Sequence, residues 1–238
     1  MKQFEFFKIL YLIEVAFGEY ANWGESEIYK TSLEKKNNVK FYTNLMEKLD
    51  ILEKKVKFCK KCSLGKYRLN TVFGEGNLNT DLMFIGEGPG YFEDHTGKPF
   101  VGKAGQLLTK IIEAMGRKRE SVYITNIVKC HPMIDPFNSE KHSNNRVPSL
   151  TEMKICKQYL DSQIEIIQPK IIVALGSTST KGLINISESL SDIRGKIMKY
   201  KNIKLISTYH PAALLRNPNL KRKTWEDIKK VMYLLNVS

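Results

Sequence analysis

The sequence has 238 residues, enough for one large domain or two small ones with a core of ordinary size. Hydrophobic residues make up 42% and charged residues 26%, which excludes a disordered chain, while 15 Gly and 8 Pro exclude collagen-like and Pro-rich classes. Lys and Arg number 38 against 25 Asp and Glu, and the resulting net charge of +13 favours a polyanionic partner, either nucleic acid or an anionic membrane surface. The charge does not say which of these partners it is, and a Lys-rich proteome can make any protein basic, so charge alone is weak evidence for either.

Residues 1–38 predict an N-terminal appendage of unknown role, followed by a folded domain at 39–238. Residues 1–17 are apolar but carry Glu5, Lys8 and Glu14, so they match neither a membrane span nor a signal peptide. We therefore expect a cytoplasmic protein. Residues 34–38 are charged and resemble a linker.

Apolar spacing predicts the elements of the domain. Steps of three and four predict a helix at about 39–56, carrying Phe41, Leu45, Leu49, Leu52 and Val56. Short apolar runs predict four strands, at residues 81–85, 122–128, 170–175 and 203–208. Amphipathic stretches predict helices from about residue 104, from a capping box at Ser149 and Glu152, from a cap at Ser177, and around residues 225–235.

The alternation of strands and helices predicts an α/β fold. Specifically, we expect three layers, α/β/α, with a central four-stranded parallel sheet. Ligands bind such sheets at the carboxyl ends of the strands. Three segments follow those ends, beginning at Gly86, Asn126 and His210.

Four cysteines are too few for a disulfide scaffold. Cys59 and Cys62 form a C-x2-C pair, which can offer two thiolates to one metal centre, and Cys130 and Cys156 follow far downstream. Four thiolates suit either a structural zinc ion or a [4Fe–4S] cluster. The alternative is that Cys156, on the apolar face of its helix, is a buried free thiol.

The segment after the first strand, GEGPG at residues 86–90, has three glycines that expose backbone N–H groups to a ligand. Its spacing matches neither a Walker loop nor a GxGxxG motif. Glu93 and Asp94 follow, and then Phe100 stands in a Gly/Pro-rich loop above the sheet. These residues favour a stacking platform for a ligand over a plain tight turn.

The last segment, HPAALLRNP at residues 210–218, places His210 at a strand end and the pair Leu214–Leu215 in an expected surface loop. Four cations flank the pair: Arg216, Lys221, Arg222 and Lys223. An exposed Leu pair among cations fits a wedge that enters a nucleic-acid stack while the cations hold phosphates. By itself His210 would be a structural histidine.

Together these segments resemble the family 4 uracil-DNA glycosylases, the iron–sulfur branch of their superfamily. The resemblance rests on GEGPGYFEDHTGKPFVGKAGQLL at residues 86–108, TNIVKC at 125–130 and HPAALLRNP at 210–218, with VFGEGN at 72–77 upstream. It covers about residues 40–238, which it identifies as the catalytic domain. It implies a DNA repair enzyme that hydrolyses the N-glycosidic bond of uracil in DNA and leaves an abasic site for base excision repair.

The resemblance also implies roles for individual residues. Asn126 would read the Watson–Crick edge of uracil, Phe100 would stack on the base, and His210 would donate to O2 and stabilise the departing anion. Glu93 would exclude the methyl group of thymine, and Gly88 would line the pocket. No general base stands at Gly88, where another branch has Asp.

Glu87 is a candidate for positioning the attacking water, and a structural hydrogen bond is an equal interpretation. By the same resemblance, Cys59, Cys62, Cys130 and Cys156 would hold a [4Fe–4S] cluster. The residues expected to contact DNA are Leu214, Leu215, Arg216, Lys221 and Lys223. The partner would be uracil-containing DNA, single- or double-stranded, bound by a monomer with no membrane contact.

The chain departs from the family in the connection from Cys130 to Cys156, which is longer than usual, with the extra material at residues 136–143. This insertion contains His142. Two other functions remain open from the residues alone: a non-catalytic nucleic-acid-binding module with a structural metal, and a nucleotide-binding enzyme using the Gly-rich turn.

Overall fold

The computed structural model describes residues 25–237, with side chains from residue 41 onward. The chain divides into two compact units, Met1–Met46 and Glu47–Ser238, and we describe each by itself. In the first unit the described part is the beginning of helix α2 (Glu25–Lys57), which continues into the second unit. Most of the predicted appendage, residues 1–24, lies outside the described residues.

Helix α2 begins at Glu25, earlier than the expected start at residue 39. The stretch at 34–38 that resembled a linker is helical, and its first three residues, Glu34, Lys35 and Lys36, have high helix propensity. The boundary expected between residues 38 and 39 therefore falls inside a helix, and the division into appendage and catalytic domain stays a prediction.

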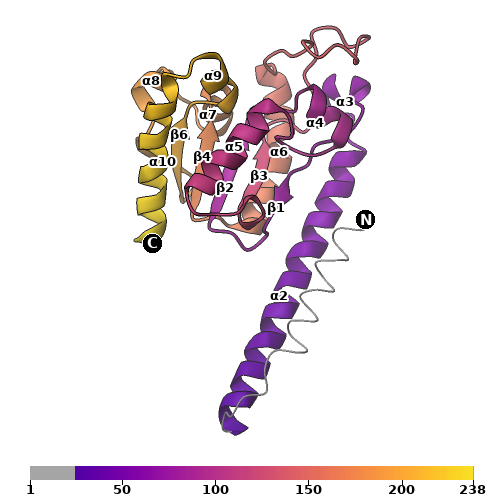
Figure 1. Cartoon of the computed structure of the whole chain (residues 1–238). Coiled ribbons are helices and arrows are strands. Elements are labelled where there is room, and N and C mark those ends of the chain that lie inside the picture. The colour runs from indigo at the N-terminus through magenta and orange to yellow at the C-terminus, as the bar shows by residue number, and fades with distance from the viewer. Residues whose placement is uncertain (1–24, 238) are drawn as a thin grey trace. The chain divides into compact units, whose positions relative to one another are not determined.

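The second unit is built on one mixed sheet, so the predicted α/β class is confirmed (Figure 1). The sheet has six strands rather than four, in the order β1-β3-β2-β4-β6-β5. The pairs β3–β2, β2–β4 and β4–β6 are parallel, whereas β1 and β5 pair antiparallel at the two edges. The strands are β1 (Glu75–Gly76), β2 (Leu82–Gly86), β3 (Tyr123–Asn126), β4 (Ile171–Leu175), β5 (Ile197–Tyr200) and β6 (Ile203–Thr208).

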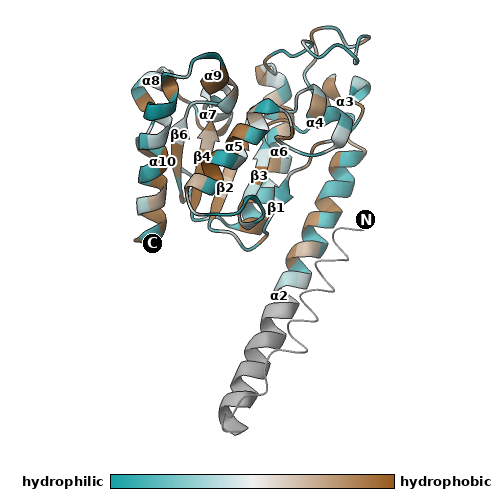
Figure 2. Ribbon diagram, in the orientation of Figure 1, coloured by the Kyte–Doolittle hydropathy of each residue, from teal (hydrophilic) through white to brown (hydrophobic). Residues whose placement is uncertain are grey.

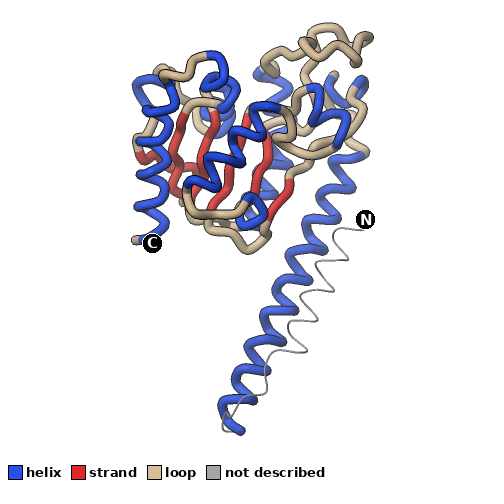
Figure 3. The backbone as a smooth tube through the Cα atoms, in the orientation of Figure 1, coloured by secondary structure: helices blue, strands red, loops and turns tan. Residues whose placement is uncertain are grey.

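Helices lie on both faces of this sheet (Figure 3). They are α3 (Leu64–Tyr67), α4 (Tyr91–Thr96), α5 (Lys103–Ala114), α6 (Leu150–Ile167), α7 (Ser177–Leu183), α8 (Leu190–Ile193), α9 (Pro211–Arg216) and α10 (Leu220–Asn236), with a short 3-10 helix at Arg119–Ser121. None of the helices in the described part of the chain is long and apolar enough to cross a membrane.

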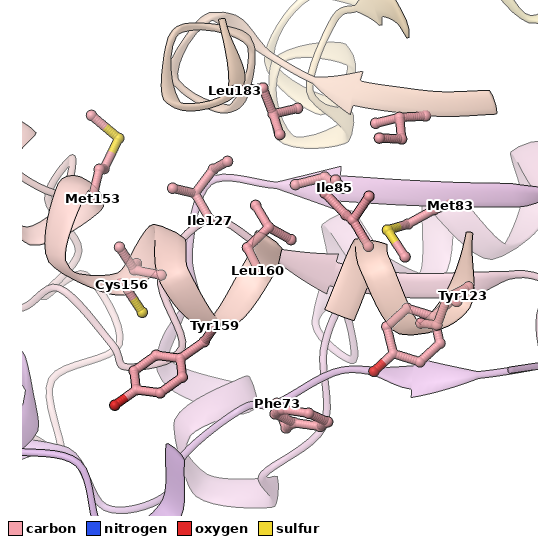
Figure 4. Packing of buried hydrophobic residues seen from close by; sticks show 14 of the residues in the cluster. Phe73, Met83, Ile85, Tyr123, Ile127, Met153, Cys156, Tyr159, Leu160 and Leu183 are labelled. Carbon is pink, nitrogen blue, oxygen red and sulfur yellow. The ribbon is translucent and has the colours of Figure 1, made fainter. Parts of the chain in front are cut away.

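Alternate residues of the central strands belong to two separate hydrophobic cores, because successive side chains of a strand point to opposite faces. On one face Met83 and Ile85 pack in a cluster with Leu160 of α6 (Figure 4). On the other, Phe84 packs in a cluster with Leu108 of α5 and Ile228 of α10. Hydrophobic residues accordingly concentrate on the central strands (Figure 2).

One expected helix cap is present, another lies at a different residue, and one expected loop is a helix. At α6 the capping box is present: Ser149 Oγ accepts from the Glu152 N–H at 3.2 Å, and the Glu152 carboxylate accepts from the Ser149 N–H at 2.8 Å. Ser177 is not the cap of α7, because Gly176 occupies that position with φ 93°. The segment after His210, expected to be a loop, is helix α9.

The winding of the chain changes direction at the carboxyl end of β2. From β2 the chain reaches β3 through α5 on one face, and from β3 it reaches β4, on the other side of β2, through α6 on the opposite face. Ligands bind doubly wound sheets where the winding changes direction in this way.

Candidate active site

The end of β2 is shaped by Gly86, against which two functional side chains pack. A Cβ atom placed on Gly86 would lie 2.4 Å from Asn126 Oδ1 and 2.4 Å from Phe100 Cζ. Only glycine leaves room for the amide of β3 and the ring of the β2–α5 connection at this point. The absence of a side chain at residue 86 thus brings Asn126 and Phe100 together.

Phe100 is held in a backbone conformation that side chains rarely adopt. Its φ is 53°, in the left-handed region, and its ring is 7% exposed. The backbone is packed directly against Gly105 of α5, where an added Cβ would lie 1.8 Å from the Phe100 carbonyl oxygen. The ring faces the imidazole of His210, with centroids 5.7 Å apart and planes inclined by 32°.

His210 is the N-cap of α9, and this contact determines where its proton lies. The Ala212 N–H donates to His210 Nδ1 at 3.2 Å, so we assign the proton of the neutral ring to Nε2. Burial, together with a smaller contribution from the Arg216 guanidinium, lowers the pKa of His210 to about 4. Near neutral pH the side chain is therefore an uncharged hydrogen-bond donor through Nε2.

Asn126, the last residue of β3, is 1% exposed. Its Oδ1 atom is buried and has no hydrogen-bond partner among the described residues. Leaving a buried amide oxygen unpaired costs about 1–3 kcal/mol, so such an atom in a folded protein calls for an explanation. A ligand that donates a hydrogen bond to this oxygen would supply one.

Glu93 joins the Gly-rich turn to the loop that carries Phe100. Its Oε1 accepts from the N–H groups of Val101 and Gly102, each at 2.9 Å, and its Oε2 accepts from the Gly90 N–H at 3.1 Å. Sequence reasoning missed this bracing role, although Glu93 at the third position of a helix is a known capping signal. The expected contact of Glu93 with a base stays a prediction.

The two residues after Gly86 lie at the same edge of the sheet. A Cβ on Gly88 would lie 2.7 Å from the Val128 side chain, so this position has no room for an acidic group. The carboxyl group of Glu87 hydrogen-bonds with the side chain of Thr178 in α7, and burial raises its pKa. That contact fits the structural interpretation of Glu87, and its role toward water stays a prediction.

All four cysteines line one small pocket, although they come from three distant parts of the chain. Cys59 and Cys62 follow α2, Cys130 follows β3, and Cys156 lies on α6, where Figure 4 shows it beside Tyr159. Among the described residues, no set of three Cys, His, Asp or Glu side chains is close enough to hold a single metal ion. Four thiols that line one pocket are a ligand set for either a structural zinc ion or a four-iron cluster.

Hydrogen-bond donors and a cation surround these sulfurs. Arg68 Nη1 donates to Cys130 Sγ at 3.2 Å, the Lys129 N–H donates to Cys156 Sγ at 3.4 Å, and the Tyr159 hydroxyl hydrogen-bonds with Cys59. Burial raises the pKa of the Cys130 thiol to about 12, and the Arg68 guanidinium acts in the opposite direction. Donors and positive charge stabilise thiolate ligands, so the pocket is suited to bound metal.

Lys129 belongs to this pocket and was not singled out from the sequence. Its side chain is 0% exposed, and burial lowers its pKa to about 7. The available signal was its place directly before Cys130 in TNIVKC, which a single sequence does not distinguish from a surface lysine.

Comparison with known proteins gives the family. Residues 73–229 match the family model described as the uracil DNA glycosylase superfamily. The chain belongs to this superfamily.

Its relatives share most of their length with it. A "Type-4 uracil-DNA glycosylase" of Sulfurisphaera tokodaii is 47% identical, over 79% of this chain and 86% of the relative. Proteins of the same name from Saccharolobus solfataricus and Thermotoga maritima are 46% and 44% identical, over 80% and 77% of this chain and 88% and 93% of theirs. The resemblance to family 4 is thereby confirmed.

In this glycosylase-superfamily chain, the segment after His210 differs from expectation in one respect. Leu214 is 1% exposed and packs inside, whereas Leu215 is 47% exposed. Neighbouring residues of a helix point in different directions, and α9 is a helix rather than a loop, so the expected exposed pair is a single exposed leucine. The expected exposure of Leu214 is therefore wrong, while the DNA contacts of Leu214 and Leu215 stay predictions.

The cations beyond Leu215 are all exposed and form what we call the α9–α10 cation surface: Arg216, Lys221, Arg222 and Lys223. Within the described residues none of the four forms an ion pair, so their charge is uncompensated locally.

The insertion at residues 136–143 folds back against α4. His142 stacks on Tyr91, the first residue of α4, with ring centroids 4.0 Å apart. The buried Asn144 closes the loop by donating to the carbonyls of Asp135 and Asn138 at 2.6 and 2.8 Å. The insertion therefore lies beside the helix that follows the Gly-rich turn.

Proposed function

We propose that the protein is a uracil-DNA glycosylase that hydrolyses the bond between uracil and deoxyribose in DNA and leaves an abasic site. The observation that carries this proposal is the buried, unpartnered Oδ1 of Asn126, beside the rings of Phe100 and His210. The names of the relatives, which cover most of this chain, support the same activity.

Asn126 would select the base. Its Oδ1 would accept from N3–H of uracil and its Nδ2 would donate to O4. Cytosine presents the reverse pattern at these two atoms and would leave buried polar groups unpaired, which a site built for hydrogen bonding rejects strongly. Phe100 would stack on the base, and Gly88 together with Glu93 would close the pocket around it.

His210 would stabilise the leaving group. When the C1′–N1 bond breaks, its electron pair stays on uracil and the charge spreads to O2, where the Nε2–H of a neutral His210 would donate. A donor of this kind is typically worth ~3–4 kcal/mol. A water oxygen then bonds to C1′ and loses a proton, completing hydrolysis.

The attacking water needs only modest activation, because the sugar resembles an oxocarbenium ion as the bond breaks. Glu87 is our candidate for positioning this water. Its pKa is raised by burial, but its nearest described partner is Thr178 rather than a pocket residue.

We further propose that Cys59, Cys62, Cys130 and Cys156 hold a [4Fe–4S] cluster. The fit is supported by the pocket that all four cysteines share, by the donors from Arg68 and Tyr159, and by the type-4 names of the relatives. When bound, the cluster would supply a covalent tie between the end of α2, the segment after β3 and α6 rather than chemistry on the base.

The α9–α10 cation surface would hold DNA phosphates on either side of the extruded base, with Leu215 next to the gap that the base leaves. The sequence-based expectations of a monomer and of a cytoplasmic location stay predictions.

A strand-cleavage assay tests the activity. Purified protein is incubated with an oligonucleotide containing one uracil and then treated with alkali, which cuts only abasic sites. A matched oligonucleotide with thymine at the same position is the control, since the closed pocket should reject its methyl group. Binding to both oligonucleotides without cleavage would instead favour a non-catalytic DNA-binding module.

Anaerobic purification tests the cluster. The expected product is brown, with a broad visible absorption and four iron atoms per chain. Colourless protein with one zinc per chain and full activity would overturn the cluster assignment and leave the glycosylase proposal standing.

A further inference from the structure

Lys129 is the most unusual charged residue of the described chain. Its side chain is 0% exposed, whereas lysines are almost never fully buried unless they are paired. No carboxylate within the described residues forms an ion pair with it. Burying a charge is costly unless other groups compensate for it, so the partners of Lys129 explain why it is there.

The ammonium group has three partners, all uncharged. Nζ donates to Thr125 Oγ1 at 2.6 Å, to the Asn126 carbonyl oxygen at 2.7 Å and to Gln163 Oε1 at 2.7 Å. An ammonium has three N–H groups, so its hydrogen-bonding capacity is fully used. Two of the partners are the last two residues of β3, and one of these is the proposed base-reading residue.

The other end of the same residue belongs to the cysteine pocket. The Lys129 N–H donates to Cys156 Sγ at 3.4 Å, its neighbour in the chain is Cys130, and Lys129 itself lines the pocket. A cluster held by four thiolates is rich in negative charge, which would compensate the buried ammonium. Lys129 is therefore in direct contact with both the proposed metal site and the backbone of Asn126.

We propose that Lys129 is a positioning residue: it fixes the Asn126 peptide so that the side-chain amide faces the base, and it links that peptide to the cysteine pocket. The inference rests on the proposed glycosylase function, because it assigns Asn126 the reading of uracil. Nζ is itself held by Thr125 and Gln163, so its hydrogen bond at 2.7 Å restricts the position of the Asn126 carbonyl. Lys129 acts through Asn126 and does not touch the substrate.

A purely structural lysine would differ in a measurable way. Loss of packing would weaken every property of the protein, with or without the Asn126 side chain. Loss of positioning would weaken only those properties that depend on the Asn126 amide. A double-mutant cycle between residues 129 and 126 separates the two cases.

The cycle uses wild type, Lys129→Met, Asn126→Ala and the double variant, and it measures binding rather than cleavage. The probe is an oligonucleotide with 2′-fluoro-deoxyuridine, whose fluorine disfavours the cationic sugar and so prevents excision. The same oligonucleotide with a tetrahydrofuran abasic analogue has no base to read and is the control. Lys157→Met, which removes a lysine that bonds Asp161 on α6, is the matched control variant.

We expect Lys129→Met to weaken binding of the uracil probe by about tenfold, the size of one charge-assisted hydrogen bond. Binding of the abasic probe should stay within about twofold of wild type, and so should all binding by Lys157→Met. When Asn126→Ala is already present, adding Lys129→Met should weaken binding of the uracil probe by less than about twofold. Iron content and visible absorption are recorded for each variant, so that loss of the cluster is seen directly.

Thr125→Val keeps the experiment decisive if Lys129→Met does not fold. It removes one acceptor from the Lys129 side chain without changing the shape of residue 125. We expect uracil-probe binding to weaken by about threefold, and we expect no such weakening when Asn126→Ala is already present.

Two outcomes would overturn the proposals in distinguishable ways. If the fold losses in uracil-probe binding of the two single variants multiply in the double variant, Lys129 is a structural residue. The same follows if Lys129→Met weakens binding of the abasic probe as much as binding of the uracil probe, and either result leaves the glycosylase function intact. A wild-type protein that binds both probes equally and excises no uracil would overturn the proposed function, and this inference with it.

Discussion

The candidate site at the ends of β2 and β3 and the α9–α10 cation surface lie on either side of His210, yet they are built in opposite ways. At the candidate site, Phe100 and Asn126 are buried, Glu93 accepts from the loop after Phe100, and Lys129 donates to the Asn126 carbonyl. On the cation surface, four side chains are exposed and unpaired within the described residues. A buried, braced site favours discrimination between bases, whereas exposed charges attract any phosphate backbone. For the proposed glycosylase, the comparison predicts that base specificity depends on the buried side of His210 and DNA affinity on the exposed side.

The sharpest test of the pocket is His210→Ala. We expect the single-turnover rate of uracil excision to fall by about a hundredfold or more, because the donor to the departing anion is lost, while binding of uracil-containing DNA persists. His142→Ala, which changes an exposed histidine in the insertion, should excise at the wild-type rate. Near-normal excision by His210→Ala would transfer the leaving-group role to backbone N–H groups around Gly88.

Asn126→Asp changes what the pocket reads. An ionised carboxylate offers an acceptor where O4 of uracil needs a donor, so uracil excision should fall by about a hundredfold, as for other sites that lose a required polar partner. Some activity on cytosine is expected, because its N4 amine is a donor. If Asn126→Asp excised uracil at the wild-type rate, the Asn126 amide would not contact this edge of the base.

Leu215→Ala tests whether the exposed leucine acts on duplex DNA. Excision from duplex should fall several-fold while excision from single strands is maintained, because only a duplex leaves a gap for a wedge to fill. Leu214→Ala is the informative comparison, since a buried leucine removed from a core costs about 2–5 kcal/mol of stability and should lower the thermal midpoint instead. Equal losses on both DNA forms for Leu215→Ala would exclude the wedge.

The smallest effect is expected on the cation surface. Lys221→Ala and Lys223→Ala should weaken binding to all DNA sequences alike and reduce the slope of log affinity against log salt by about one per lost contact. Lys229→Ala, two turns further along α10, is the matched control and should leave the slope unchanged. Sequence-dependent losses at residues 221 or 223 would mean that these residues read bases and that the division between the two sides of His210 is wrong.

Much of the fold could be predicted from the sequence because the central strands are buried on both faces. In β2 and β4 all five residues are buried, and such uniformly apolar runs stand out in a sequence. The edge strand β5 is exposed at Ile197 and Lys199 and gives no such signal. Strand β1 has only two residues, too few for any periodicity.

The candidate site was predictable where it depends on topology and not where it depends on side-chain packing. Asn126 and His210 lie at the same edge of the sheet because the carboxyl ends of parallel strands share that edge, and Phe100 lies beside both. The burial of Leu214 follows from α9, whose signal was Pro211 directly after a capping residue. The burial of Lys129 depends on three acceptors contributed by β3 and α6, which only the folded chain brings together.

The pocket lined by Cys59, Cys62, Cys130 and Cys156 has a consequence for how the protein is made. The thiols come from the end of α2, from the segment after β3 and from α6, so the pocket does not exist until these segments have been synthesised and packed. Long-range contacts of this kind form late, because the entropy of closing long loops must first be offset. For a chain that takes up a cluster here, binding of the cluster requires these segments to come together, so assembly of the cluster is coupled to folding of the domain.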